Sequence, residues 1–183
     1  EFIEKSLGEK INNDNSDFYE KVSALMAEDN FTEAKDMLEN FFIDNPKEFK
    51  GFAMYIDCLT SLDEFKEANL FIESLDSEAT NDTNIKSSIQ KLSIKEKNKQ
   101  GPSIDFFLNE LKNKPKNIDI INKLADKYFA ENRLDDAFSL LLNNYKKDTN
   151  KIKNKFIEFF DALGNENEFT IKYRKKLSSI MFA

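Results

Sequence analysis

Few residues in this chain could carry out catalytic chemistry. The chain has 183 residues, no histidine and a single cysteine, Cys58. Histidine is the commonest general base and metal ligand in proteins, and an internal disulfide needs two cysteines. Cys58 lies in an apolar stretch between Ile56 and Leu59, so we interpret it as a packed structural thiol rather than a reactive one. We therefore expect no catalytic residue, no cofactor-binding residue and no metal ligand.

Two adjacent carboxylate pairs are the remaining candidates for acid–base catalysis. They are Asp63 with Glu64, and Asp135 with Asp136. Each pair follows a predicted turn and begins a predicted helix, where carboxylates complement the positive end of the helix dipole. Capping therefore explains both pairs better than catalysis does, and the sequence indicates a binding protein rather than an enzyme.

Charged residues are unevenly distributed along the chain. Residues 1–93 contain 9 basic and 21 acidic residues, and residues 94–183 contain 18 basic and 13 acidic residues. The two halves therefore carry net charges of −12 and +5, and the whole chain carries −7. Such an asymmetry can steer a charged partner or orient the molecule in a complex.

Two lysine clusters raise the alternative of nucleic-acid binding. They are Lys95, Lys97 and Lys99, followed by Lys146, Lys147, Lys151, Lys153 and Lys155. Both clusters sit at predicted helix ends and turns, where lysines complement the carbonyl end of the helix dipole. Because the negative charge of the whole chain also repels phosphate groups, we expect no nucleic-acid partner.

No stretch of the sequence resembles a membrane span or a secretory signal. Apolar runs stay well below the ~20 residues needed to cross a bilayer, and no basic region followed by an apolar region opens the chain. We expect a soluble, cytoplasmic protein with no membrane partner. The sequence begins with Glu1 rather than Met, which predicts that residue 1 is an internal position of a longer polypeptide.

The elements that would position a binding site recur at a fixed interval. Residues 31–46 form an amphipathic helix pattern, in which a small alanine precedes larger apolar residues. Phe31, Ala34, Leu38 and Phe41 return 34 residues later as Phe65, Ala68, Ile72 and Leu75. The preceding helices match as well, with Phe18, Val22 and Leu25 returning as Phe52, Ile56 and Leu59. An interval of 34 residues is the tetratricopeptide period, so the sequence predicts an all-α, right-handed helical solenoid.

We predict a repeat domain over residues 13–183. It comprises about four helix pairs, at residues 15–48, 49–82, 84–117 and 118–150, followed by capping helices at residues 151–183. Residues 1–12 are expected to be a short helix end and a linker, because the polar stretch Asn12–Ser16 is typical of a turn.

Two local features refine this plan. Asn30 and Glu33 fit a capping arrangement at the start of the second helix. The third pair is degenerate, because its first helix is expected to fray over Lys95–Gln100 before Gly101 and Pro102 interrupt the chain.

Three blocks in the last third of the chain are more specific than the repeat. They are LADKYFAENRLDDAFSLLL, KNKFIEFFDALG and EFTIKYRKKLSSIMF, in this order between Asn122 and Phe182. In order and spacing they resemble the carboxy-terminal part of the YbbN (CnoX) type thioredoxin-linked co-chaperones. The break at Gly101 and Pro102 also fits that family. The segment Glu1–Gly8 resembles the end of the last helix of the thioredoxin fold that precedes the repeats there. The resemblance thus implies that residues 1–12 are the end of an upstream thioredoxin-like domain and its linker.

The resemblance implies a bacterial, cytoplasmic stress-response protein. Such a protein acts as a holdase, which binds unfolded or oxidised clients and passes them to the chaperonin and the Hsp70 system. Any redox activity would lie in an upstream thioredoxin-like domain, because this chain contains no C-x-x-C motif. The alternative hypothesis is a tetratricopeptide scaffold for a cell-envelope or secretion assembly, which would use the same repeats.

The register of the repeat predicts where a partner would bind. The first helix of each pair lines the concave groove of a tetratricopeptide array, which selects Tyr19, Ser23, Met26, Ala53, Asp57 and Thr60 in the first two units. The last helix adds Ile180, Met181 and Phe182. These three residues either dock against Phe156 and Phe160 or insert into a chaperonin groove as an anchor.

Overall fold

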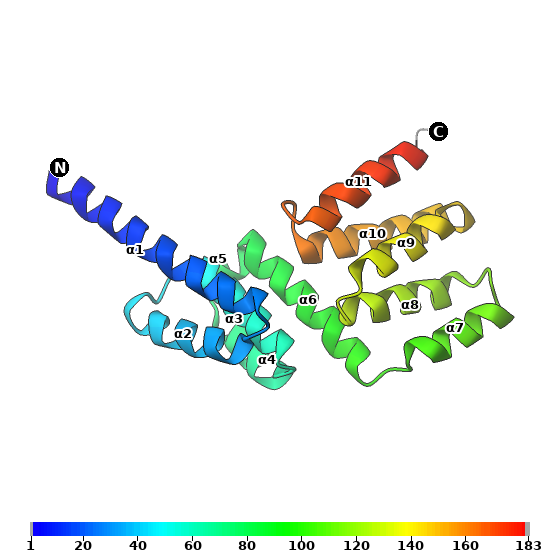
Figure 1. Ribbon diagram of the computed structural model, residues 1–183, viewed down its shortest axis with the longest axis horizontal. Coiled ribbons are helices and arrows are strands. Elements are labelled where there is room, and N and C mark those ends of the chain that lie inside the picture. The colour runs from blue at the N-terminus through cyan, green and yellow to red at the C-terminus, as the bar shows by residue number, and fades with distance from the viewer. Residues whose placement is uncertain (1, 182–183) are drawn as a thin grey trace.

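The structure, a computed structural model, describes the backbone of residues 2–181 and the side chains of residues 15–181. This part of the chain is helical and has no strand (Figure 1). The elements are α1 (Phe2–Ala27), α2 (Phe31–Asp44), α3 (Phe49–Ser61), α4 (Phe65–Ser74), α5 (Ser77–Asn81), α6 (Thr83–Lys99), α7 (Ile104–Asn113), α8 (Ile118–Ala130), α9 (Leu134–Asn144), the 3-10 helix η1 (Tyr145–Lys147), α10 (Thr149–Leu163) and α11 (Glu168–Met181). The prediction of an all-α fold is confirmed.

Three turns within helix pairs share one backbone conformation. Asp29, Asp63 and Asn132 have positive φ angles of 58°, 62° and 57°. The residue after each donates its N–H to a carbonyl five positions back, at 2.9, 2.9 and 2.8 Å. This is the Schellman ending of a helix, with Asp or Asn in place of the usual Gly, because their short polar side chains tolerate the left-handed conformation. Asp29 and Asp63 are 34 residues apart, so the turn recurs with the same period as the apolar residues.

Side-chain caps begin several of the helices. Backbone N–H groups donate to the side chains of Asp76, Asp82, Ser103, Asn117 and Asp148. The prediction that the Asn30 side chain caps α2 is wrong. Asn30 Nδ2 donates to Glu33 Oε2 at 2.6 Å, and the Asn30 side chain accepts no hydrogen bond from the start of α2. The two side chains satisfy each other instead of the helix end.

Two predicted irregularities are helical in the structure. The expected turn at Asn12–Ser16 is wrong, because the backbone of α1 continues through it, and this stretch contains no Gly or Pro that would stop a helix. The assignment of residues 1–12 to an upstream domain stays a prediction. The expected fraying over Lys95–Gln100 is also wrong up to Lys99, where α6 ends. Lys95 and Lys99 both form ion pairs with Asp63, which holds this end of α6 in place.

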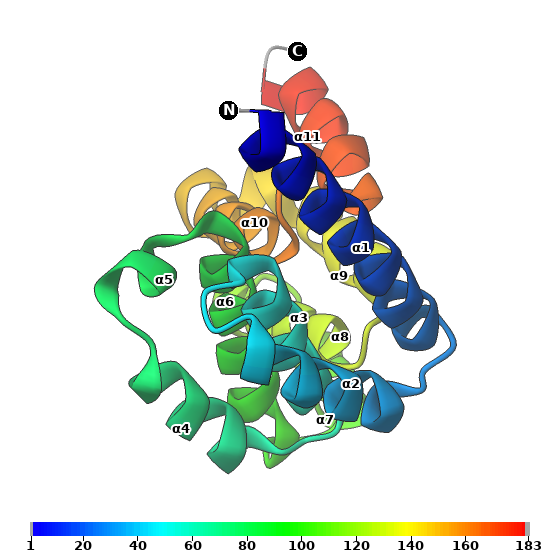
Figure 2. The same ribbon diagram turned by 90° about the vertical axis from the view of Figure 1, so that its left-hand side faces the viewer.

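Helix α6 is the centre of the molecule (Figures 1 and 2). It packs against α3 on one side and against α8 and α10 on the other. The three apolar clusters of the core each include one α6 residue, namely Ile85, Leu92 or Ile94. Burying these side chains on both sides of one helix joins the two halves of the solenoid, α1–α5 and α7–α11.

Candidate binding groove between the two halves of the solenoid

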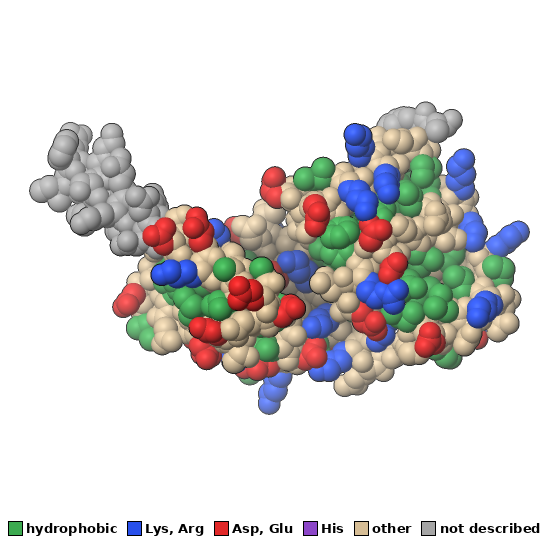
Figure 3. Space-filling view, viewed as in Figure 1, with side chains coloured by type: hydrophobic (Ala, Val, Ile, Leu, Met, Phe, Trp, Pro, Cys, Tyr) green, Lys and Arg blue, Asp and Glu red, His purple; other side chains and the backbone are tan. Residues whose placement is uncertain are grey.

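A hollow lies between the two halves of the solenoid, with α6 as its floor. It consists of two adjoining cavities of about 440 and 450 Å³, which share Met26, Asp57, Lys91 and Leu163. Figure 3 shows this hollow at the middle of the molecule, with Lys or Arg side chains inside it and acidic side chains gathered over the amino-terminal half. We call this hollow the groove.

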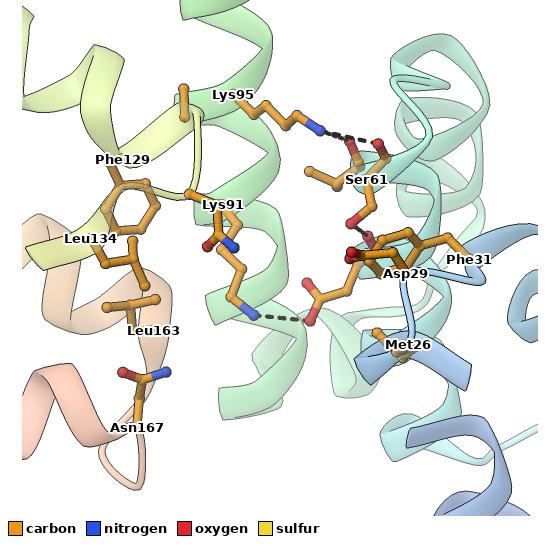
Figure 4. A pocket seen from close by; sticks show the side chains of 14 residues that line it. Met26, Asp29, Phe31, Ser61, Lys91, Lys95, Phe129, Leu134, Leu163 and Asn167 are labelled. Atoms are coloured by element: carbon orange, nitrogen blue, oxygen red, sulfur yellow. Dashed lines mark hydrogen bonds and ion pairs between the residues drawn. The ribbon is translucent and has the colours of Figure 1, made fainter. Parts of the chain in front are cut away.

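The two walls of the groove differ in chemistry (Figure 4). The wall from α8, the start of α9 and the end of α10 presents Phe129, Leu134 and Leu163. The opposite wall comes from α3 and the end of α1, and it presents Met26, Asp29, Asp57, Thr60 and Ser61. One wall is therefore mainly apolar, and the other is polar with carboxylates.

Lysines of α6 cross the floor of the groove towards α3 (Figure 4). Lys91 Nζ lies 2.9 Å from Asp57 Oδ2. Lys95 Nζ donates to the carbonyl oxygens of Thr60 and Ser61 at 2.9 and 3.1 Å, which caps the end of α3. Both ammonium groups are therefore paired with the α3 wall, and their methylene stems form the floor.

Asp63 anchors the end of α6 to the α3–α4 turn. Its carboxylate oxygens lie 3.2 Å from Lys95 Nζ and 3.2 Å from Lys99 Nζ. Burial alone would raise the pKa of Asp63, but hydrogen bonds from the two lysines outweigh burial and hold the pKa below its usual range. The carboxylate is therefore ionised whenever the protein is folded near neutral pH.

Five of the six groove residues selected by register line this groove. They are Ser23, Met26, Ala53, Asp57 and Thr60. Tyr19 does not line it, because its side chain is buried and its hydroxyl donates to Glu48 Oε2 at 2.9 Å. Burial, and then the neighbouring Glu48, raise the pKa of Tyr19, so its role here is structural. Partner binding by the other five residues stays a prediction.

The groove also contains residues that the sequence analysis did not select. Ser87 and Lys91 of α6 lie 34 residues after Ala53 and Asp57, so the same period extended into the degenerate third unit would have found them. Leu163 has no such signal. It enters the groove because α10 packs back against α6, which the linear repeat pattern does not specify.

The three candidate residues at the end of α11 lie apart from the groove. Ile180 is half-buried and packs against the core cluster of the carboxy-terminal half. Met181 is 43% exposed, and Phe182 lies outside the described residues. Docking of these residues against Phe156 and Phe160 stays a prediction, as does a role of Met181 and Phe182 as an anchor.

The other residues that the sequence analysis weighed for chemistry have structural contacts. Cys58 is fully buried, and burial together with the nearby Asp57 raises the pKa of its thiol to about 12. Glu64 pairs with Lys35 at 2.9 Å, and Asp135 pairs with Lys172. Neither carboxylate accepts a capping hydrogen bond, and both form ion pairs between helices. Asp135 and Asp136 lie in the first turn of α9, as predicted, where carboxylates complement the helix dipole.

A half-buried ion cluster holds α10 against α8, outside the groove lining. Lys155 Nζ lies 2.8 Å from Asp126 Oδ1 and 2.6 Å from Glu158 Oε2. Burial raises the pKa of Asp126, and the attraction of Lys155 offsets only part of that effect. For Lys155, burial would lower the pKa, but Asp126 and Glu158 outweigh burial and raise it. The cluster is therefore structural, and burial destabilises the charged form of Asp126 within it.

The family comparison agrees with this geometry. Residues 97–182 match a tetratricopeptide-repeat family model. The fold is that of a tetratricopeptide-like solenoid, in which stacked helix pairs create extended concave surfaces. A solved domain of the Vibrio parahaemolyticus protein VP0806, of unknown function, is 25% identical to this chain, with 90% of this chain and 98% of that chain covered and a TM-score of 0.43. No curated protein matches the chain.

Tetratricopeptide-repeat domains are modules of protein–protein interaction, and the repeats themselves are not catalytic. The segment 97–182 therefore matches a repeat of the kind that binds proteins. Within the described residues, no group of His, Cys, Asp and Glu is arranged to hold a metal ion. None of the described helices is long and apolar enough to cross a membrane.

Proposed function

We propose that this chain is the client-binding module of a co-chaperone, and that it holds non-native protein segments in the groove. The groove combines an apolar wall with two methionines, Met26 and Met54, whose flexible side chains adapt to different ligands. Figure 3 shows it as a hollow between the two halves of the solenoid. The single observation that carries the proposal is this continuous, partly apolar groove at the position that the repeat register selects.

The finer assignment, to a thioredoxin-linked co-chaperone, rests on the resemblance of the last third of the chain. The three blocks between Asn122 and Phe182 lie inside the segment 97–182 that matches the tetratricopeptide model. In this proposal the module receives unfolded or oxidised clients and delivers them to the chaperonin and the Hsp70 system. The coding sequence upstream of Glu1 tests the assignment: a thioredoxin-like domain supports it, and a secretory signal peptide contradicts it.

An aggregation assay tests holdase activity directly. A chemically unfolded client is diluted into buffer with and without the module, and light scattering reports aggregation. We expect the wild-type module to suppress scattering. Ser23→Arg should weaken this suppression, because Ser23 is exposed on the groove and the longer side chain fills it.

Ala24→Arg is the matched control. Ala24 is the next residue of α1, is also exposed, and does not line the groove, so this variant adds the same charge outside the site. Equal suppression by both variants would show that clients do not use the groove. If the wild-type module suppresses no aggregation, the co-chaperone assignment is wrong, while the general role in protein binding remains.

A further inference from the structure

The two ends of the groove can be distinguished, because the residue numbers of its lining increase in the same direction along three helices. One end is lined by Ser23 of α1, Lys50 of α3 and Asn84 of α6. The other end is lined by later residues of the same helices, Asp29 just after α1, Ser61 of α3 and Lys95 of α6. The three helices therefore run the same way along the groove. We call these the Lys50 end and the Asp29 end.

Most charges inside the groove are already balanced. Lys91 pairs with Asp57, and Lys95 pairs with Asp63 and the end of α3. The charges left over lie at opposite ends. Asp29 is exposed and forms no ion pair among the described residues, and Lys50 is exposed and contacts the Tyr19 ring, with its Nζ 4.5 Å from the ring centre.

Helix ends of both kinds meet at each end of the groove, so their dipoles largely cancel. At the Lys50 end α3 and α6 begin but α10 ends, and at the Asp29 end α1, α3 and α8 end but α2, α9 and α11 begin. The polarity of the groove therefore comes from the side chains of Asp29 and Lys50. Between the two ends, Met26, Met54 and Leu163 form an apolar middle.

We propose that the groove takes an extended client segment of matching polarity, with a Lys or Arg side chain at the Asp29 end, apolar side chains in the middle and an Asp or Glu side chain at the Lys50 end. This inference rests on the proposed function and adds to it the chemistry of the bound segment. Charge complementarity of this kind fixes register and excludes wrong partners more than it raises affinity. The module would thus select client segments by charge order as well as by apolar content.

Fluorescent peptides test the polarity through double-mutant cycles. The probe carries Lys near one end, Glu near the other and leucines between, and two analogues replace either the Lys or the Glu with Gln. Asp29→Asn keeps a residue that tolerates the left-handed turn, and it should weaken binding of the probe about threefold, as for an exposed ion pair. That loss should vanish with the analogue lacking Lys. Lys50→Gln should show the same coupling to the peptide Glu.

Two control variants remove the same charges outside the groove. Asp36→Asn lies on the exposed face of α2, and Lys47→Gln lies before α3, and neither residue lines the groove. We expect no coupling of either control to the peptide charges. If Asp36→Asn couples to the peptide Lys as strongly as Asp29→Asn does, the attraction is general and the proposed polarity is wrong.

The outcomes separate this inference from the proposed function. If Ser23→Arg abolishes peptide binding while Asp29→Asn and Lys50→Gln change nothing, the groove is the site and its polarity is wrong. If peptides bind Ser23→Arg as well as they bind wild type, the groove is not the site and both proposals fall. Coupling of Asp29 to the peptide Glu would overturn the inferred direction.

Discussion

The carboxylate of Asp63 shows how one residue ties two helix pairs together. It accepts from Lys95 and Lys99, and its side chain is 39% exposed. Because the folded state lowers the pKa of Asp63, the stabilisation is present above the usual pKa of about 4 and is lost as the pH falls through the folded pKa. Asp63→Asn should lower the free energy of unfolding at pH 7 by about 0.5–1 kcal/mol, which allows for screening by solvent. In urea titrations this difference should shrink on acidification and disappear below the folded pKa.

Asp29→Asn is the control for that measurement. Asp29 occupies the equivalent turn position, with a φ of 58°, and forms no ion pair among the described residues. Asn tolerates the left-handed conformation as Asp does, so the variant should unfold like the wild type at both pH values. Equal losses in the two variants would mean that the turn conformation, and not the lysine contacts, sets the stability.

Lys155 compensates a buried charge, in contrast to Lys151 one turn earlier on α10. The side chains of Lys155 and Asp126 are 14% and 21% exposed, whereas those of Lys151 and Asp119 are 56% and 70% exposed. Lys155→Met leaves the half-buried Asp126 without its cation and should cost about 1–3 kcal/mol of unfolding free energy. Lys151→Met should change the unfolding free energy far less, because both members of that pair are exposed.

The pH dependence of the Lys155→Met variant provides a second check. Burial already raises the pKa of Asp126, and removing Lys155 raises it further. A carboxyl with a raised folded pKa takes up a proton more readily in the folded state, so stability increases as the pH falls from the folded pKa towards the usual value of about 4. The deficit of the variant should therefore shrink on mild acidification in denaturant titrations. A deficit that stays constant would assign the loss to packing of the lysine stem.

At the scale of elements, Gly51 determines how closely α3 approaches the first helix pair. A Cβ at this position would lie 2.9 Å from Cε1 of Phe42 and 3.4 Å from the hydroxyl of Tyr19. Both neighbours are aromatic rings packed in the core, so Gly51→Ala should lower the unfolding free energy by about 1–3 kcal/mol. Gly101→Ala is the control, because the nearest atom to its Cβ is 3.7 Å away. Thermal unfolding that ranks the two variants in the opposite order would contradict this close approach of α3.

The elements whose register comes from local signals were predictable from the sequence. Val22, Ile56 and Leu59 are fully buried as their period required, and Gly164 ends α10 with a φ of 81°. The course of α6 was not predictable, because its polar last turns are stabilised by Asp63 from another repeat. The apolar wall at Leu163 was missed for the same reason, since it depends on contacts between distant segments. Local patterns specify helices, whereas the groove results from how those helices pack.

At the scale of the whole molecule, the packing of α6 against both halves of the solenoid predicts that the two halves unfold together. Leu92 of α6 is 2% exposed, and Leu92→Ala should cost about 2–4 kcal/mol through the cavity it leaves. Because α6 packs on both α3 and α10, hydrogen exchange should rise in both helices of this variant. Ile157→Ala, at a residue of α10 that is 45% exposed, should change exchange little. Faster exchange confined to α1–α5 would show that the halves are independent units.

Polar contacts on both sides of α6 determine how the groove can open. On one side Ser88 Oγ donates to the Ala53 carbonyl at 3.1 Å, and on the other Ser87 Oγ donates to the Asp161 carbonyl at 2.7 Å. No glycine or proline occurs anywhere in α6, so the floor has no hinge residue. A wider groove requires α3 or α10 to slide along α6 and exchange such hydrogen bonds. The module should therefore adjust to bulkier segments by small shear steps of its packed helices, and each step has a definite hydrogen-bonding register.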